Sequence, residues 1–202
     1  MYKLYFLPGA CSLATQVVLH ELGQPVQLIN KQQMADFNQI NPVGTVPVLV
    51  DNDQPYREGA AIMLYLLDKH PNTLLPSSGQ ARLQGIQNIL FANATMHPAY
   101  SRLFFIAQNI SANTAQAEAY QRASQAINQL WQVVEEQLAQ QPFLGGAQPS
   151  AADIMLTVYS RWGGAFPVTI NIGPRTQQML DHVLAMPSFQ RALAAEQAQA
   201  AA

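Results

Sequence analysis

The hydrophobic pattern of this chain changes near residue 71. Before that point, short apolar runs alternate with helical patterns in the order strand, helix, strand and then strand, strand, helix. Residues 71–80, PNTLLPSSGQ, have the proline, serine and glycine content of a linker. Beyond the linker, apolar residues recur at helical spacing. The pattern therefore predicts an α/β domain over residues 1–76 and an all-helical domain over residues 77–202.

The first domain has the pattern of a small sheet with one parallel and one antiparallel half. Gly23 is placed to cap the first helix, and Pro25 prevents its continuation. Pro47 stands at the start of the third strand, where proline is tolerated. We expect strands at residues 3–7, 26–29, 46–50 and 54–58, and helices over residues 12–22 and 59–70.

The second domain is expected to be entirely helical. Pro98 should kink or divide its first helix, because proline removes a backbone hydrogen bond. Ser150 and Asp153 predict a capping box at the start of the third helix. The last residues, AEQAQAAA (195–202), are expected to be frayed. The helical patterns cover residues 82–108, 115–140, a stretch from 151 onward, and 175–196.

The charge balance excludes several classes of partner. The formal net charge is -2 and charged residues make up only 11% of the chain, so the clustered lysine and arginine that bind nucleic acid are missing. No apolar stretch approaches the roughly 20 residues that cross a bilayer, and the segment MYKLYFLPG lacks a signal-peptide core. One cysteine forms no internal disulfide and no CxxC motif. We therefore expect a cytoplasmic protein that binds neither nucleic acid nor membrane and holds no metal.

Cys11 is the only cysteine, and it directly precedes the first predicted helix. Unpaired N–H groups and the helix dipole at such a position favour the thiolate and lower its pKa. Ser12 offers a hydroxyl that can donate to a sulfur anion. The alternative is a small buried core residue, a role that cysteine often has. Position alone does not separate these two interpretations.

Val46 and Pro47 favour a chemical role for Cys11. In a thioredoxin-like layer, the loop before the third strand holds a cis-proline beside the cysteine, and the preceding residue presents its backbone to an extended peptide. The order of the elements matches this arrangement, so we predict a cis Val46–Pro47 bond although trans is the default. Val46 would then pair with a peptide ligand through main-chain hydrogen bonds.

Other candidate positions each have a functional and a structural interpretation. Glu58 and Gly59 lie where the fourth strand passes into a helix, and this helix start suits a carboxylate while Glu58 suits an ammonium group. An acidic residue there often only complements the helix dipole. His97 is a catalytic candidate or an ordinary packed side chain. Trp162 is most simply a core residue.

In this order, the segments resemble a glutathione S-transferase. LYFLPGACSLA, NPVGTVPVLV, REGAAIMLYL and SAADIML are similar to segments of the bacterial beta class, and the resemblance covers essentially the whole chain. It implies a thioredoxin-like amino-terminal domain followed by an all-helical carboxy-terminal domain. It also implies a homodimer whose subunits bind the tripeptide glutathione as co-substrate.

The resemblance implies roles for individual residues around the glutathione sulfur. Cys11 matches a cysteine that contacts this sulfur or forms a mixed disulfide with it, and Ser12 flanks it. His97 matches a histidine near the sulfur. Trp162 matches a tryptophan beside the second-substrate pocket.

The rest of glutathione would be held by the first domain. Val46, next to Pro47, matches the residue that pairs with the cysteinyl backbone of the tripeptide. Glu58 matches an acidic residue that holds the γ-glutamyl end. Gly59 matches the residue whose helix-start N–H holds the same end.

Three positions depart from the family pattern. Pro98 stands where a lysine usually follows the histidine, which removes a cation and bends the helix. Leu90 stands where the family commonly has asparagine. Lys31 is the only counterpart we can offer for a basic residue expected between the second and third strands. These departures predict weaker or differently arranged glutathione binding.

We therefore expect an enzyme that binds glutathione and presents its thiolate to small apolar electrophiles, peroxides or mixed disulfides, as in detoxification. The sequence does not specify the second substrate. One alternative is a non-catalytic binding or regulatory protein with the same fold. Another is a glutathione-dependent isomerase or dehalogenase.

Overall fold

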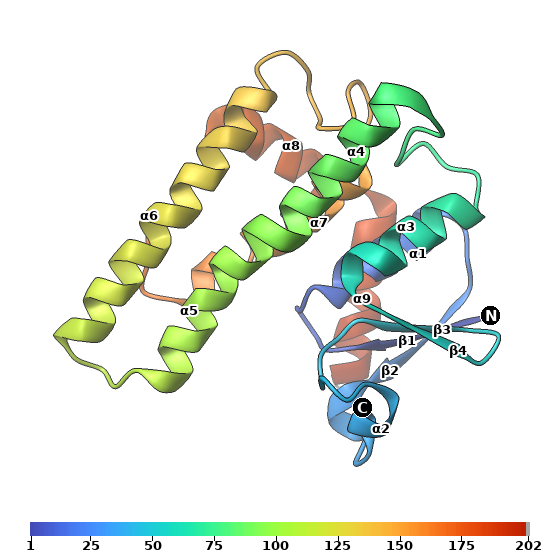
Figure 1. Ribbon diagram of the computed structural model, residues 1–202, viewed down its shortest axis with the longest axis horizontal. Helices are drawn as coiled ribbons and strands as arrows, with labels where there is room; N and C mark the ends of the chain where they lie inside the picture. The colour runs from blue at the N-terminus through green and yellow to red at the C-terminus, as the bar shows by residue number, and fades with distance from the viewer. Residues whose placement is uncertain (201–202) are drawn as a thin grey trace.

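The computed structural model describes residues 1–200, and its first part is a four-stranded sheet (Figure 1). The strand order is β2-β1-β3-β4. β1 pairs in parallel with β2, whereas β1 with β3 and β3 with β4 are antiparallel. This mixed sheet confirms the pattern expected from the sequence. The strands are β1 (Tyr2–Phe6), β2 (Val26–Asn30), β3 (Val48–Asp51) and β4 (Gln54–Arg57).

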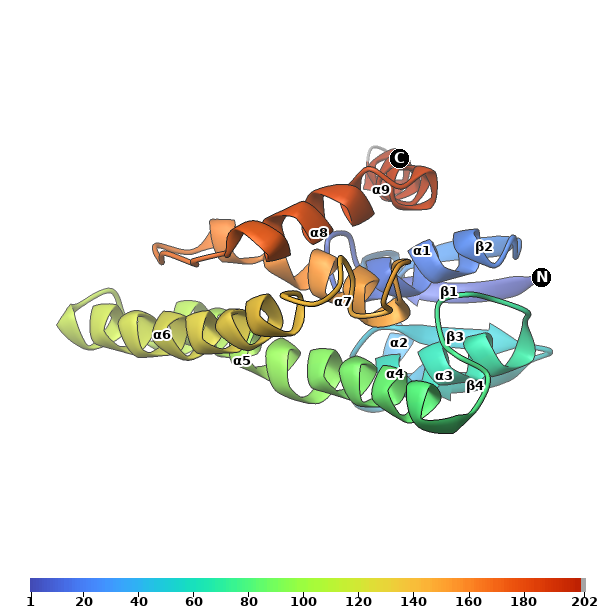
Figure 2. The same ribbon diagram turned by 90° about the horizontal axis from the view of Figure 1, so that it is seen from above.

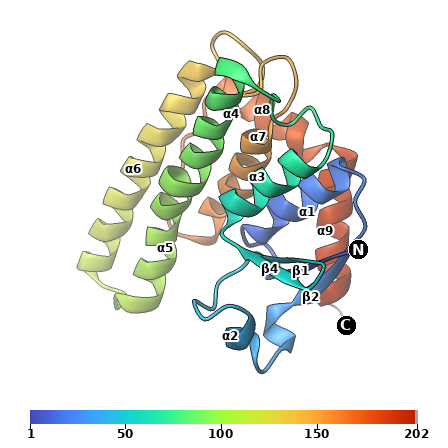
Figure 3. The ribbon, with the colours of Figure 1, turned by 45° about the vertical axis from the view of Figure 1, so that its right-hand side comes forward.

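Two helices, α1 (Ser12–Glu21) and α3 (Gly59–Lys69), cover one face of this sheet, and α2 (Phe37–Ile40) lies on the other side (Figure 3). Leu4 and Leu49 pair across β1 and β3, and both are fully buried beneath the helices. Because successive strand residues point to opposite faces, this pairing aligns the apolar face of the sheet with the apolar side of α1. The result is a thioredoxin-like layer.

α1 ends as its sequence predicts. Gly23 has a φ of 64°, in the left-handed region that glycine adopts without strain. Its N–H donates to the carbonyl of His20, and the N–H of Gln24 donates to the carbonyl of Leu19. These bonds satisfy carbonyls at the end of the helix, and Pro25 then turns the chain into β2.

The segment between β2 and β3 brings the chain back to the end of the sheet beside Cys11. It contains the short helix η1 (Lys31–Gln33) and α2. The Val46–Pro47 peptide bond is cis, as predicted. β3 begins at Val48 rather than at the expected residue 46, since Pro47 has no N–H to pair with a neighbouring strand.

The second part of the chain is helical, and it forms a layered bundle (Figure 2). α7 lies between α4 on one side and α8 on the other, and it is buried over nearly its whole length. Trp131 and Tyr100 pack in the core of the bundle, where the indole N–H donates to the phenol oxygen at 2.8 Å. The helices are α4 (Gly79–Phe91), η2 (Ala92–Met96), α5 (His97–Asn109), α6 (Thr114–Gln137), α7 (Ala151–Ser160), η3 (Gly163–Ala165), α8 (Pro174–Leu184) and α9 (Pro187–Ala200).

Pro98 divides the first long helix, as expected. α4 gives way to the π-helical turn η2 over residues 92–96, and α5 begins at His97. Because Pro98 has no N–H, it cannot continue the regular hydrogen-bond ladder of the preceding turn. The wider turn places His97 at the start of a new helix.

The predicted capping box at α7 is present. The Ser150 hydroxyl accepts from the N–H of Asp153, and the Asp153 carboxylate accepts from the N–H of Ser150 at 2.7 Å. The second carboxylate oxygen accepts from the N–H of Leu144 at 2.9 Å. Burial raises the pKa of Asp153, and the hydrogen bonds oppose that shift. The box therefore fixes both the start of α7 and the loop before it.

The expectation that residues 195–202 are frayed is wrong for residues 195–200, which belong to α9; residues 201–202 lie outside the described part of the chain. α9 packs against α1, and Glu196 in its last turns is 5% exposed. Its carboxylate is paired with groups of the first domain, so tertiary contacts hold this end of the helix. Within residues 1–200, no helix combines the length and apolar character that crossing a membrane requires.

Candidate active site

Two clefts meet between the sheet and the helical bundle. One has a volume of about 280 Å³ and the other about 480 Å³. Cys11 and His97 line both of them. The smaller, here the polar cleft, is lined chiefly by Cys11, Thr15, Thr45, Val46, Pro47, Glu58, Gly59, Asn93, His97 and Tyr159. The larger, here the apolar cleft, is lined by Leu7, Pro8, Gly9, Ala10, Cys11, His97, Ser101, Phe104, Arg161, Trp162 and Ala165.

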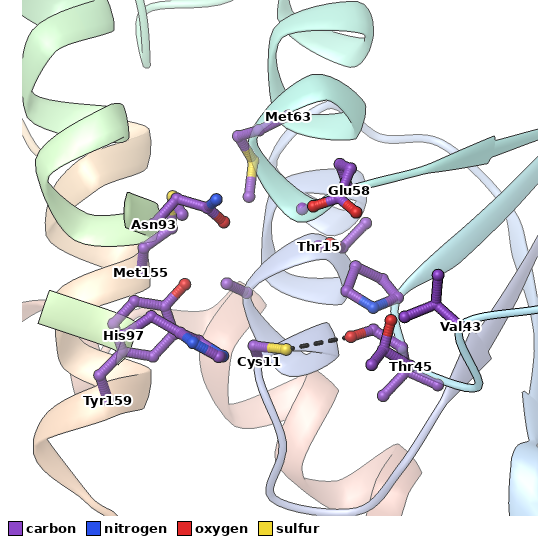
Figure 4. Close-up of a pocket in the computed structure, with 14 residues that line it drawn as sticks. Cys11, Thr15, Val43, Thr45, Glu58, Met63, Asn93, His97, Met155 and Tyr159 are labelled. Atoms are coloured by element: carbon purple, nitrogen blue, oxygen red, sulfur yellow. Dashed lines mark hydrogen bonds between the residues drawn. The ribbon is translucent and has the colours of Figure 1, made fainter. Parts of the chain in front are cut away.

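Cys11 is the residue that caps the start of α1, and it is partly exposed. Its thiol donates a hydrogen bond to the carbonyl of Val46 at 3.2 Å (Figure 4). Burial raises the pKa of Cys11 to about 11, while backbone N–H groups of Cys11 and Ser12 lower it and the charge of Glu58 raises it further. The helix start thus acts in the expected direction, but desolvation outweighs it. The expected low pKa is therefore wrong, and Cys11 is a neutral thiol at neutral pH.

The Ser12 side chain does not reach either cleft. It is fully buried, and its hydroxyl faces the backbone of Leu7, accepting from the N–H at 3.3 Å and lying 3.4 Å from the carbonyl oxygen. Only the backbone N–H of Ser12 acts on the sulfur of Cys11. The structure therefore does not bring the Ser12 hydroxyl to the position that the sequence suggested.

Val46 and Pro47 lie at the edge of the polar cleft nearest to Cys11. The loop before them is held by Asn41, whose side-chain N–H donates to the carbonyl of Thr45 at 2.8 Å. Val46 is partly exposed and Pro47 is buried. The Val46 main chain thus faces the cleft from a fixed loop, as a site for an extended peptide requires.

Glu58 and Gly59 line the polar cleft beside Pro47. Glu58 has a φ of 70°, a left-handed value that is uncommon for a residue other than glycine and that marks local strain. Its carboxylate lies at the cleft (Figure 4). A Cβ at Gly59 would lie 3.2 Å from Oδ1 of Asn93 and 3.9 Å from the ring of Pro47, so the close approach favours glycine. α3 begins at Gly59, and its first N–H groups have no partner within the helix.

His97 occupies the boundary between the two clefts. Its ring packs edge-on against Tyr159 and Trp162, with centroids 5.2 Å from each. Nδ1 lies 3.3 Å from the Ser101 hydroxyl oxygen. Burial lowers the pKa of His97, so the imidazole is neutral at neutral pH. A neutral imidazole has one donor and one acceptor to offer to a substrate.

Trp162 lines the apolar cleft and also contacts the loop that precedes Cys11. Its indole N–H donates to the carbonyl of Gly9 at 2.8 Å. The N–H of Gly9 donates to Oε2 of Glu196 at 2.8 Å, and Oε1 of Glu196 accepts from the side-chain amide of Gln16 at 2.6 Å. Two residues of the helical domain therefore hold both sides of Gly9, two positions before Cys11.

Sequence reasoning did not identify several residues of the site. Thr15 follows Cys11 by one helical turn, and this spacing was the available signal. Asn93 lies in the π-helical turn, which the sequence did not predict. Glu196 lies in the segment expected to be frayed. Lys31 lines neither cleft, and its ammonium group donates to the carbonyl of Gly44.

The described residues show no grouping suited to a metal ion. In the part of the chain that the structure describes, residues 1–200, no three histidine, cysteine, aspartate or glutamate side chains come together. The polar cleft instead offers main-chain groups, a carboxylate and a thiol. These are the groups that bind an organic ligand with both a peptide backbone and charged ends.

Comparison with known proteins gives consistent matches over both parts of the chain. Residues 12–74 match the family model for the glutathione S-transferase amino-terminal domain, and residues 117–162 match the model for its carboxy-terminal domain. Glutathione S-transferase GST-4.5 of Xanthomonas campestris pv. campestris is 31% identical over 200 residues, which cover 96% of this chain and 98% of that protein.

Two solved structures extend the similarity to three dimensions. The glutathione S-transferase from Xylella fastidiosa superimposes with a TM-score of 0.88 at 30% identity, covering 97% of this chain and 98% of that one. The bacterial beta class glutathione S-transferase of Sphingomonas chungbukensis superimposes with a TM-score of 0.83 at 28% identity, covering 96% and 98%. The architecture of both parts is therefore shared with bacterial glutathione S-transferases.

Proposed function

The chain belongs to the glutathione S-transferase family, and we propose that its polar cleft binds glutathione while its apolar cleft binds the second substrate. The enzyme is a glutathione transferase and resembles the bacterial beta class. One observation carries the proposal: the two clefts meet at Cys11 and His97. A glutathione sulfur at this junction would face the second substrate in the apolar cleft.

In this proposal, glutathione lies extended across the polar cleft. The main chain of Val46 pairs with the cysteinyl backbone, and Glu58 accepts from the ammonium group of the γ-glutamyl end. The N–H groups at the start of α3 bind the neighbouring carboxylate. In this structure the Cys11 thiol donates a hydrogen bond to the Val46 carbonyl. We infer that a backbone N–H of the tripeptide replaces the thiol as donor to this carbonyl, which leaves the thiol free to turn toward the glutathione sulfur.

Cys11 then acts as a hydrogen-bond donor to the glutathione thiolate. With a pKa of about 11, Cys11 keeps its proton at neutral pH. Its S–H and the backbone N–H at the start of α1 stabilise negative charge on the substrate sulfur, which lowers the pKa of that sulfur. The proton of the glutathione thiol passes to solvent, and Ser12 contributes through its N–H.

The reaction best supported is conjugation. The thiolate forms a carbon–sulfur bond with an electrophile in the apolar cleft, and the leaving group departs with the electrons of the bond that breaks. Neutral His97 can donate a hydrogen bond to the group that gains charge. Thiol transfer through a Cys11 mixed disulfide is a weaker candidate, because that exchange needs a Cys11 thiolate and a pKa of about 11 keeps it scarce. Peroxide reduction by the glutathione thiolate stays a second candidate, since it needs no Cys11 thiolate.

We extend the proposal to the assembly and setting of the enzyme. Leu83 and Leu90 lie two turns apart on α4, and they are 50% and 45% exposed. This apolar face suits the homodimer that the family resemblance implies.

We also place the enzyme in the cytoplasm, where it would detoxify electrophiles. In this proposal residues 1–76 form the glutathione-binding domain, and residues 77–202 form the domain that contributes the second-substrate pocket.

Two measurements on the purified protein test the function. Calorimetric titration with glutathione should show saturable binding, and addition of chlorodinitrobenzene with glutathione should release chloride and form the thioether. The variant Glu58→Ala, which lacks the carboxylate proposed to hold the ammonium group, should bind glutathione more weakly. Glu118→Ala removes an exposed carboxylate of α6 that lines neither cleft, and it serves as the matched control. A folded wild-type protein that neither binds glutathione nor forms the thioether would overturn the proposal.

A further inference from the structure

We propose that the apolar cleft selects electrophiles that carry an anionic group and that the guanidinium of Arg161 binds this group. The inference rests on the proposed function and names the substrate class of its second site. Neither the family matches nor the resemblance assigns a charge preference to this cleft. The observation behind it is a cation at an aromatic surface with no side-chain partner in the described part of the chain.

Within residues 1–200, Arg161 is the one lining residue of the apolar cleft that is charged at neutral pH. The other lining residues are apolar or neutral, and His97 is neutral because burial lowers its pKa. An arginine keeps its charge at any physiological pH. A ring bound against Trp162 and Phe104 therefore meets one full charge, and that charge is positive.

The guanidinium has no partner among residues 1–200, neither a salt bridge nor a side-chain hydrogen bond. Burial raises the pKa of Glu196, and the positive charge of Arg161 lowers it by a smaller amount. Both oxygens of Glu196 already accept hydrogen bonds, from Gly9 and Gln16. The planar donor fork of Arg161 thus remains available for a carboxylate or another oxyanion.

The backbone fixes where this cation emerges. Arg161 is the residue that ends α7, and its N–H bonds to the carbonyl of Val158. The next residue, Trp162, is held to Gly9 by its indole N–H. Phe104 packs edge-on to Trp162 with centroids 5.9 Å apart. Arg161 is exposed, so a ring against these aromatics would place its anionic substituent at the rim of the cleft.

The charge of bound glutathione strengthens the preference. In the proposed complex its thiolate lies at the junction beside Cys11, where it repels an anionic group of the second substrate. An anionic electrophile is therefore attracted at the Arg161 end of the apolar cleft and repelled at the junction. This fixes its orientation, with the charged group held away from the thiolate.

A pair of substrates that match in size but differ in charge tests the inference, and comparing wild type with variants cancels their different intrinsic reactivities. A chlorodinitrobenzoate and the primary amide of the same acid both react with the glutathione thiolate, which displaces chloride and forms a thioether. The readout is the ratio of kcat/KM for the acid to that for the amide. In Arg161→Gln we expect this ratio to fall by roughly five- to tenfold, the range for one charge-assisted hydrogen bond at an exposed site. Added salt should lower the wild-type ratio.

Two further variants separate binding by the fork from a general charge effect. Arg102→Gln removes the same charge from an exposed position on α5 outside the cleft, and it should leave the ratio unchanged. Arg161→Lys keeps the charge but loses the planar fork, and it should give an intermediate ratio. An equal ratio in wild type and Arg161→Gln, with both substrates conjugated, overturns the inference alone. A wild type that conjugates neither substrate overturns the proposed function together with it.

Discussion

The polar and apolar clefts share Cys11 and His97 but are built in different ways. In the proposed complex, the polar cleft binds glutathione through main-chain groups at Val46 and at the start of α3, together with the Glu58 carboxylate. The apolar cleft is lined by side chains of the helical domain, such as Phe104 and Trp162, and by the loop between β1 and α1. Recognition of glutathione therefore depends mainly on backbone that the fold holds in place, whereas recognition of the second substrate depends on side chains.

The largest effect should come from the carboxylate that joins the two domains at the apolar cleft. Glu196→Ala removes the acceptor for the Gly9 N–H and leaves the buried amide of Gln16 unpaired. We expect about 2–3 kcal/mol less stability toward urea unfolding. We also expect a several-fold higher KM for the electrophile with the KM for glutathione within about twofold, because Gly9 lines only the apolar cleft.

Two control variants test this prediction. Glu118→Ala removes an exposed carboxylate of α6 and should change neither quantity. The exchange Gln16→Glu with Glu196→Gln keeps one carboxylate and one amide in the same pair, so it should recover most of the loss. Equal increases in both KM values would show that Glu196 supports the whole fold rather than the Gly9 loop.

The next effect should appear in the polar cleft. Glu58→Ala removes the carboxylate proposed to hold the ammonium end of glutathione, and we expect roughly thirtyfold weaker glutathione binding by calorimetry. The KM for the electrophile should change little, since Glu58 does not line the apolar cleft. Unchanged glutathione affinity in this variant would remove Glu58 from the proposed site.

A smaller effect should follow from removing the hydrogen bond between Trp162 and the loop that contains Gly9. Trp162→Phe keeps an aromatic ring in the apolar cleft but loses the indole N–H bond to Gly9. We expect the KM for the electrophile to rise about fivefold, the value of one neutral hydrogen bond, with glutathione affinity unchanged. Steady-state kinetics with each substrate varied in turn measures both. A change confined to glutathione would reverse the assignment of the clefts.

The smallest effect concerns the thiol that both clefts share. Because the pKa of Cys11 is about 11, its alkylation by iodoacetamide should rise close to tenfold per pH unit from neutral pH until pH approaches about 11. Removing the negative charge in Glu58→Gln should lower this pKa slightly, since Glu58 is the least of the factors that set it. A rate that is already maximal at neutral pH would mean that the helix start outweighs burial after all.

The sequence predicted the main-chain half of the site better than the rest. The cis bond at Pro47 and the helix start at Gly59 follow from the order of elements, which local pattern reveals. The raised pKa of Cys11 depends on burial by elements distant in sequence, which no local pattern measures. The contact between Gly9 and Glu196 joins residues 187 positions apart, and the alanine and glutamine around Glu196 resemble an unpacked end.

A crystal structure with the dinitrophenyl thioether of glutathione would test the two-cleft account most directly, since this product contains both substrates joined at one sulfur. The account predicts its peptide along Val46 and Glu58, its ring against Trp162 and Phe104, and its sulfur between Cys11 and His97. A product bound with its ring in the polar cleft, or with its sulfur remote from Cys11, would contradict the account.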